Sequence, residues 1–146
     1  MAKTAAGAVN NPGNIRTEKY PYKGEFYDAK QPFLSFDTLA NGYNAMVVKY
    51  RYYYDKFGDK TLNAIINRYA PPADNNDTSA YVKDVSEAIG CDPDADFGDI
   101  LNNNDTMAAM LKAVTVVEQG NDFVTQNSDD IDAAISSLFS ENAYNA

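Results

Sequence analysis

The chain has 146 residues, a formal net charge of −9, one cysteine and no histidine. This length suits one domain with a modest core, and the acidic balance argues against nucleic acid and membrane partners, since their phosphates attract positive charge. The lack of histidine excludes Ser-His-Asp and Cys-His catalysis and most zinc sites, so we expect no metal and no cofactor. A basic patch at Lys49, Arg51 and Lys56 is the alternative to a solvated helix face.

The N-terminal part, residues 1–36, is predicted to be irregular or strand-like. "NNPGNIR" (10–16) predicts a turn, because Pro12 fixes one backbone angle and Gly13 permits the bend. "PYKGEFY" (21–27) is typical of a short hairpin with its bend at Lys23-Gly24, and "FLSF" (33–36) of a half-buried strand.

Apolar residues then recur at helical spacing in four segments and again in the tail. The predicted helices span 38–57, 62–69, about 78–89, about 104–119, and a stretch around 131–138. Their expected caps are Asp37 or Thr38, Asp59 or Thr61, Asp77 or Thr78, Asn104 or Asp105, and Ser128 or Asp129. The predicted fold class is mainly α with a small irregular or β N-terminal lobe, arranged as a domain over 1–120 and an acidic tail over 121–146.

"CDPDADFGD" (91–99) is read as an acidic turn. It resembles a calcium-binding EF-hand loop only in its carboxylates, because the glycine is displaced to Gly98 and the twelfth position is Asn103 rather than glutamate. Cys91 has no base near it in the sequence and is interpreted as incidental.

The remaining chemistry is that of carboxylates, and Glu118 differs from the other glutamates. It follows Val116-Val117 at the end of a predicted helix, where the helix dipole and partial burial both disfavour the charged form. Both effects raise the pKa, as a general acid for glycosidic cleavage requires. An exposed helix end is the alternative, and Glu18, Glu25 and Glu87 are expected on the surface.

Several motifs between Asn10 and Gly120 resemble a family of small bacteriophage virion proteins, often described only as structural. The matching motifs are, in order, "NNPGNIR", "F-x-x-F-D-T", "G-Y-N-A-M", "RYAPPADNNDTSAYV" and "E-x-G". The resemblance implies a protein carried in the virion. The N-terminal "MAKTAAGAV" (1–9) is too weak for a secretion signal, so no signal peptide is expected. The apolar face of the predicted tail helix, Ile131 to Phe139, is expected to dock on other virion proteins.

The same stretches are similar to peptidoglycan hydrolases of the lysozyme superfamily. "Y-A-P-P…D-T-S-A-Y-V-K-D-V" resembles a region of lytic transglycosylases, and "N-P-G-N-I-R…F-L-S-F-D-T" a region of glucosaminidases. In those enzymes the helix that ends in the acidic glutamate comes first in the chain. Here it comes near the end, which a circular permutation would explain. That permutation requires Glu118 to lie near Asn14, Arg16 and Tyr69.

This resemblance implies a lysozyme-like domain that degrades peptidoglycan glycan strands during phage entry, as a lytic transglycosylase or a muramidase-like enzyme. Glu118 would be the catalytic residue, and Asn14, Arg16, Tyr69 and Tyr81 would bind the substrate. A catalytically silent virion structural or glycan-binding protein on the same fold is the main alternative, and an ordinary helical domain is the third. The acidic net charge weighs against the enzyme, because enzymes that act on anionic cell walls are often basic.

Overall fold

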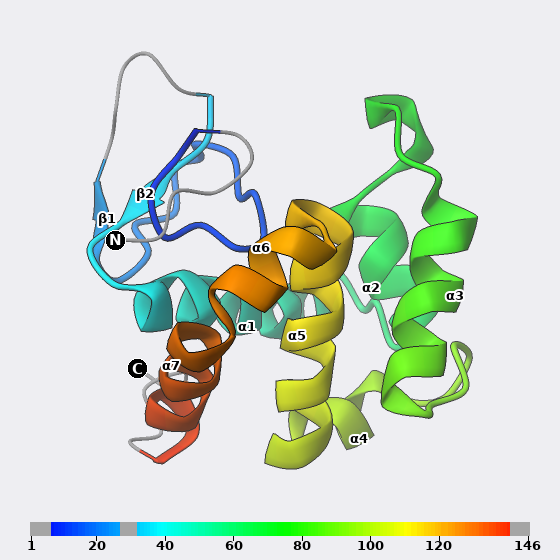
Figure 1. The fold of residues 1–146 in the computed structure, drawn as a ribbon. Helices are drawn as coiled ribbons and strands as arrows, with labels where there is room; N and C mark the ends of the chain where they lie inside the picture. The colour runs from blue at the N-terminus through cyan, green and yellow to red at the C-terminus, as the bar shows by residue number, and fades with distance from the viewer. Residues whose placement is uncertain (1–6, 27–31, 141–146) are drawn as a thin grey trace. The chain divides into compact units, whose positions relative to one another are not determined.

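The structure, a computed structural model, describes residues 7–26 and 32–140 (Figure 1). The chain divides into two compact units. Unit 1 contains Met1–Val48 and Val114–Ala146, and unit 2 contains Lys49–Ala113. Unit 1 is therefore discontinuous, because its N-terminal part is joined by residues from the end of the chain.

A two-stranded antiparallel sheet lies in the N-terminal part of unit 1. Strand β1 (Glu25–Phe26) pairs with β2 (Ser35–Phe36), so that Glu25 lies opposite Phe36. The predicted hairpin within "PYKGEFY" is therefore wrong in its pairing, although Gly24 has a φ of 75° at the expected bend; Tyr27 lies outside the described residues. Both residues of β2 are buried, so the strand lacks the expected exposed side.

Four helices contribute to unit 1, and two of them extend into unit 2. They are α1 (Leu39–Lys56), α5 (Asn104–Gln119), α6 (Asn121–Gln126) and α7 (Ser128–Ser140). The hydroxyl of Thr38 accepts a hydrogen bond from the backbone N–H of Asn41 near the start of α1. Near the start of α5, Asn103 plays the same role toward Thr106, so the caps predicted at Asn104 or Asp105 are wrong by one or two residues.

The core of unit 1 joins these helices through buried side chains. Tyr43 of α1 is fully buried, and its hydroxyl lies 2.8 Å from the hydroxyl of Thr115 on α5. Burial raises the pKa of Tyr43 to about 12. This hydrogen bond satisfies the two neutral hydroxyls inside the core. It also fixes how α1 is rotated about its own axis against α5.

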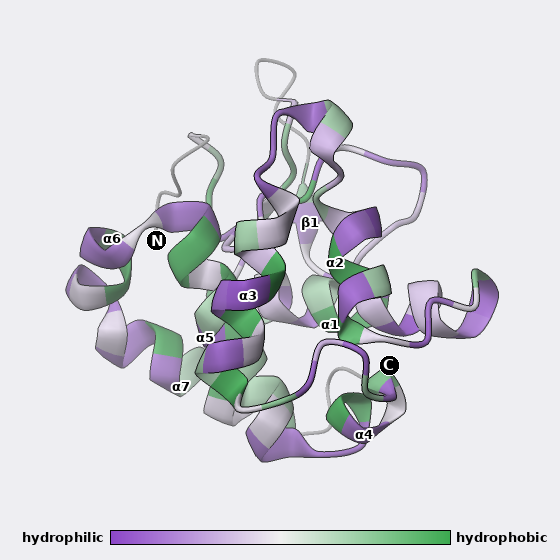
Figure 2. Ribbon diagram, turned by 90° about the vertical axis from the view of Figure 1, so that its right-hand side faces the viewer, coloured by the Kyte–Doolittle hydropathy of each residue, from purple (hydrophilic) through white to green (hydrophobic). Residues whose placement is uncertain are grey.

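The tail helix α7 is amphipathic, with hydrophilic and hydrophobic residues alternating along its ribbon (Figure 2). Its apolar residues are buried within the chain itself: Ile131, Ala134, Ile135 and Leu138. This face is therefore covered within the chain, and the binding of other virion proteins through the tail stays a prediction. The tail's acidic residues Asp129, Asp130 and Asp132 are exposed, whereas Glu141 lies outside the described residues.

Unit 2 contains three further α-helices and a 3-10 turn. They are α2 (Leu62–Tyr69), η1 (Pro72–Asp74), α3 (Thr78–Ile89) and α4 (Phe97–Leu101). Thr61 caps α2 and Asp77 caps α3, each by accepting a bond from a backbone N–H three residues on. A mainly α fold with a small N-terminal sheet, as predicted, is confirmed.

The acidic turn after α3 has a structural role. Asp96 accepts hydrogen bonds from the backbone N–H of Gly98 at the start of α4 and from the hydroxyl of Tyr54. These two bonds lower the pKa of Asp96, and the bond from the Gly98 backbone is the larger cause.

Among residues 7–26 and 32–140, none of the helices has the length and the apolar character needed to span a membrane.

Candidate functional site

The "NNPGN" segment forms a tight turn. The backbone N–H of Asn14 donates to the carbonyl of Asn11 at 3.2 Å, with Pro12-Gly13 between them. Asn10 and Asn14 flank this turn with left-handed φ angles of 55° and 52°, a conformation that asparagine tolerates better than most residues. The asparagines therefore contribute to the bend together with the predicted Pro-Gly pair.

Asn11 anchors the turn from inside. Its side chain is fully buried and donates to the carbonyls of Ile15 at 2.9 Å and Leu34 at 2.7 Å. Its Oδ1 accepts from the backbone N–H of Ile15, so the amide uses both its donor and its acceptor. Because each of these polar groups is buried and satisfied, the turn is held against Leu34, the residue before β2.

The turn presents Asn14 to the end of α5. Nδ2 of Asn14 donates to Oε1 of Glu118 at 2.9 Å and lies 3.3 Å from the backbone carbonyl oxygen of Glu118. Both residues are partly buried. Carbonyls in the last turn of a helix lack an intrahelical partner, so Asn14 satisfies one of them while it orients the carboxylate. The proximity that the permuted arrangement requires is thus present for Asn14.

Gln119 completes this network, and sequence reasoning missed it. Its Nε2 donates to the carbonyls of Asn11 at 3.3 Å and Pro12 at 3.1 Å, and to Oδ1 of Asn14 at 2.9 Å. The segment around the turn and the end of α5 lie side by side in Figure 1. The only available signal was an amide side chain next to the glutamate, which is too common to be diagnostic.

The other predicted substrate-binding residues have different surroundings. The guanidinium of Arg16 lies 4.9 Å from the ring centroid of Phe33, on which it stacks, and Arg16 is exposed. Tyr69 and Tyr81 belong to unit 2. Tyr69 packs against Tyr50 with ring centroids 5.4 Å apart, and Tyr81 is 4% exposed. Their substrate-binding roles stay predictions.

Hydrolysis would need a second carboxylate, and three described carboxylates in the N-terminal part of unit 1 could supply it: Glu18, Glu25 and Asp37. Glu18 accepts from the hydroxyl of Tyr22 at 2.6 Å, and Asp37 accepts from Asn41 at 2.7 Å. Glu25 is half-buried, and its Oε2 is inaccessible to solvent without a hydrogen-bond partner. Burial raises the pKa of Glu25, as does the nearby Glu18 charge to a smaller extent. Glu25 is thus more perturbed than its expected surface position implied.

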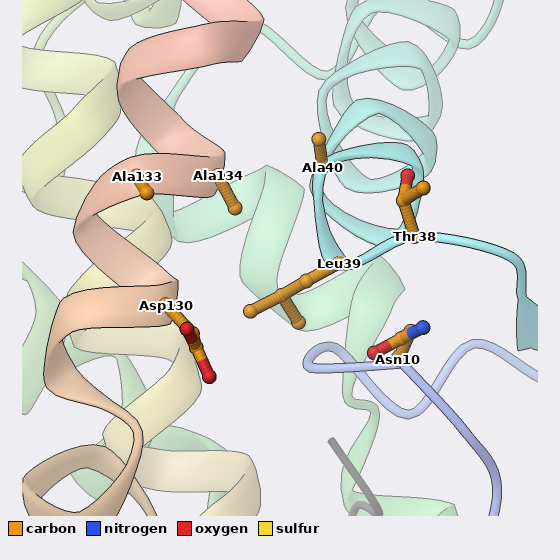
Figure 3. Close-up of a pocket in the computed structure, with 7 residues that line it drawn as sticks. All are labelled: Asn10, Thr38, Leu39, Ala40, Asp130, Ala133 and Ala134. Atoms are coloured by element: carbon orange, nitrogen blue, oxygen red, sulfur yellow. The ribbon is translucent and has the colours of Figure 1, made fainter. Parts of the chain in front are cut away.

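A hollow of about 410 Å³ lies elsewhere in unit 1, between the start of α1 and α7 (Figure 3). Leu39 points across it toward α7, and Asn10 borders it from the N-terminal segment. Its lining also includes Asp130 and Ala134, but none of the predicted site residues.

Within residues 7–26 and 32–140, no group of three or more acidic or cysteine side chains is placed to hold a metal ion. No protein-family model and no curated protein matches this sequence. The site is therefore defined by its own geometry. Hydrogen bonds join Asn14 of the turn to Glu118 and Gln119 at the end of α5.

Proposed function

We propose that this protein cleaves the glycan strands of peptidoglycan, with Glu118 as the general acid. The observation that supports this proposal is the 2.9 Å hydrogen bond from Asn14 to Glu118. It joins the "NNPGNIR" turn to the "E-x-G" end of α5, two motifs that resemble those of phage virion proteins. Virion localisation, and the action on the cell wall during entry, belong to the same proposal.

In the proposed reaction Glu118 protonates the glycosidic oxygen as the bond to the sugar breaks. A lytic transglycosylase needs no second carboxylate, because a hydroxyl of the substrate closes an anhydro ring and gives its proton back to the glutamate. Hydrolysis would need a second carboxylate to activate water or to act as nucleophile. Glu18 and Asp37 are engaged by neighbouring side chains, and Oε2 of Glu25 is inaccessible to solvent, so the transglycosylase route fits the described residues more simply.

Asn14 has a positioning role in this proposal. A hydrogen bond to one carboxylate oxygen restricts the rotation of the Glu118 side chain and fixes where a proton can be delivered. Gln119 in turn holds the Asn14 amide, because its Nε2 donates to Asn14 Oδ1. Such support around a reacting group is what keeps catalytic geometry within narrow limits.

The alternative is a catalytically silent virion protein that uses the same network as a clamp. The hydrogen bonds of Asn14 with Glu118 and Gln119 join parts of the chain more than 100 positions apart. Holding these parts together is by itself a sufficient structural role for the bonds. Under this alternative Glu118 is an acceptor that holds the turn, and the protein has a structural or glycan-binding role.

A zymogram on peptidoglycan with purified wild type, Glu118→Gln and Glu87→Gln separates the two functions. The glutamine at 118 keeps an oxygen that can accept from Asn14, so the fold is expected to be retained, as circular dichroism will show. Glu87 is exposed on α3 and serves as the matched control. Clearing by wild type and Glu87→Gln, but not by Glu118→Gln, supports catalysis. No clearing by any folded variant supports the clamp.

A further inference from the structure

We propose that copies of this chain bind one another head to tail, through a basic aromatic surface on unit 2 and an acidic corner on unit 1 of the next copy. The basic aromatic surface consists of Lys49, Tyr52, Tyr53, Phe57 and Arg68. The acidic corner consists of residues 125–130. This inference goes beyond the proposed function and uses none of its residues.

The basic aromatic surface exposes two large rings in contact with each other. Phe57 is 51% exposed and Tyr52 is 46% exposed. Their ring centroids are 5.3 Å apart and the rings meet edge to face at 87°. Two adjoining aromatic side chains at the surface form an apolar patch, which in a soluble protein is typical of an interaction site.

Cations lie over Phe57 and over the adjoining ring of Tyr53, which is only 9% exposed. The guanidinium carbon of Arg68 lies 4.2 Å from the centroid of Phe57 and 5.8 Å from that of Tyr53, and the Lys49 amine lies 5.6 Å from Tyr53. Arg68 is also held by an ion pair with Asp59. The surface is therefore ordered before it binds, which reduces the entropy cost of association. Aromatic and arginine side chains are those that contribute most at protein interfaces.

Charge complementarity favours a second copy of the chain as the partner. The segment 49–68 contains five basic and two acidic residues, in a chain whose net charge is −9. The segment 120–146 contains five acidic residues and no basic residue. One chain thus carries an excess of each sign in separate segments, and opposite surfaces of two copies attract each other.

The acidic corner also has a shape that suits the contact. Where α6 meets α7, a hollow of about 330 Å³ is lined by Thr125, Gln126, Asn127, Ser128, Asp129 and Asp130. Both carboxylates are exposed. A hollow with polar walls and two carboxylates is suited to a basic side chain, such as Lys49 of the neighbouring copy.

Because the two surfaces differ, the contact is heterologous, and this predicts a specific result on mixing. Tyr52→Ala/Phe57→Ala removes one surface, and Asp129→Asn/Asp130→Asn removes the other. Each double variant alone should be monomeric, since it lacks one half of the contact. An equal mixture should form one-to-one dimers, because each variant retains the half that the other has lost.

Sedimentation velocity of the full chain tests this. In roughly 0.05 M salt the wild type should associate, and in roughly 0.5 M salt association should weaken as the charges are screened. At the lower salt concentration each double variant alone should sediment as a monomer. Tyr20→Ala and Asp84→Asn, which change an exposed aromatic and an exposed acid elsewhere, should associate like wild type.

Two results would overturn the inference: a wild type that is monomeric at low salt up to its solubility limit, or a mixture that does not recover association. If Tyr52→Ala/Phe57→Ala loses its circular dichroism signal, Arg68→Gln takes its place in the mixing experiment. Glu118→Gln should associate like wild type, so a failure of the cleavage proposal leaves this test intact.

Discussion

Gln119 donates from Nε2 to Oδ1 of Asn14 at 2.9 Å, although 105 positions separate the two residues along the chain. This bond determines which way the Asn14 amide faces. Because the atom that accepts from Gln119 is the oxygen, Nδ2 is left facing Glu118, to which it donates. The contact between the "NNPGN" turn and the end of α5 therefore positions the candidate acid.

Gln119→Ala is expected to lower the free energy of unfolding by about 1–3 kcal/mol, because three oxygen acceptors of the turn lose a donor. Urea unfolding monitored by circular dichroism measures the change. Gln126→Ala, at an exposed position on α6, is the control and should stay within about 0.5 kcal/mol of wild type. An equal effect of both substitutions would show that the clamp contributes nothing.

Asn14→Ala is expected to reduce the rate of peptidoglycan cleavage by about 10- to 100-fold, since it frees the Glu118 carboxylate to rotate. The effect should fall mainly on kcat, because Asn14 positions the acid rather than the glycan. Initial rates of muropeptide release at several substrate concentrations separate kcat from KM. A loss confined to KM would instead indicate that Asn14 binds the substrate directly, as the family resemblance implies.

Gly42→Ala tests how closely the turn docks on α1. A Cβ at this position would lie 2.0 Å from the carbonyl oxygen of Asn10 and 2.9 Å from Cδ of Pro12. In an exposed helix the same substitution stabilises by about 1 kcal/mol, because alanine has the higher helix propensity. We expect a destabilisation of about 1–3 kcal/mol instead. The sign of the measured change in the urea midpoint decides the question.

Glu25→Gln tests the buried carboxylate by its pH dependence. Burial raises the pKa of Glu25, so the folded chain holds this proton at a pH where the unfolded chain has released it. Wild type therefore loses stability as pH rises from the unfolded value, 4.5, to the higher folded value, and glutamine does not titrate. Denaturation from about pH 4 to about pH 7 should show the variant gaining stability relative to wild type. Glu87→Gln should show no such gain.

The longer helices were predictable because their signals are local. Apolar spacing and caps such as Thr61 and Asp77 determined α2 and α3 to within a residue. Helix α4 was missed because five residues are too few to show a helical period, and its Asp96 cap was read as part of a polar turn. Helix α6, with six residues and no buried side chain, has the same explanation.

The sheet and the site depend on contacts that local patterns do not encode. Turn chemistry favoured a bend at Lys23-Gly24, but Glu25–Phe26 pairs instead with Ser35–Phe36. The proximity of Asn14 and Glu118 followed only from the family resemblance, not from spacing. Gln119 has no periodic or cap signature, so its role becomes visible only when the turn and the end of α5 are seen together.

The release of soluble muropeptides from purified peptidoglycan, measured by chromatography and mass spectrometry, tests the central claim most directly. Wild type is expected to release products that end in an anhydro sugar, without the added mass of water, and Glu118→Gln is expected to release none above the buffer control. Products released equally by wild type and Glu118→Gln, or by neither when both are folded, would contradict the assignment of Glu118 as the acid.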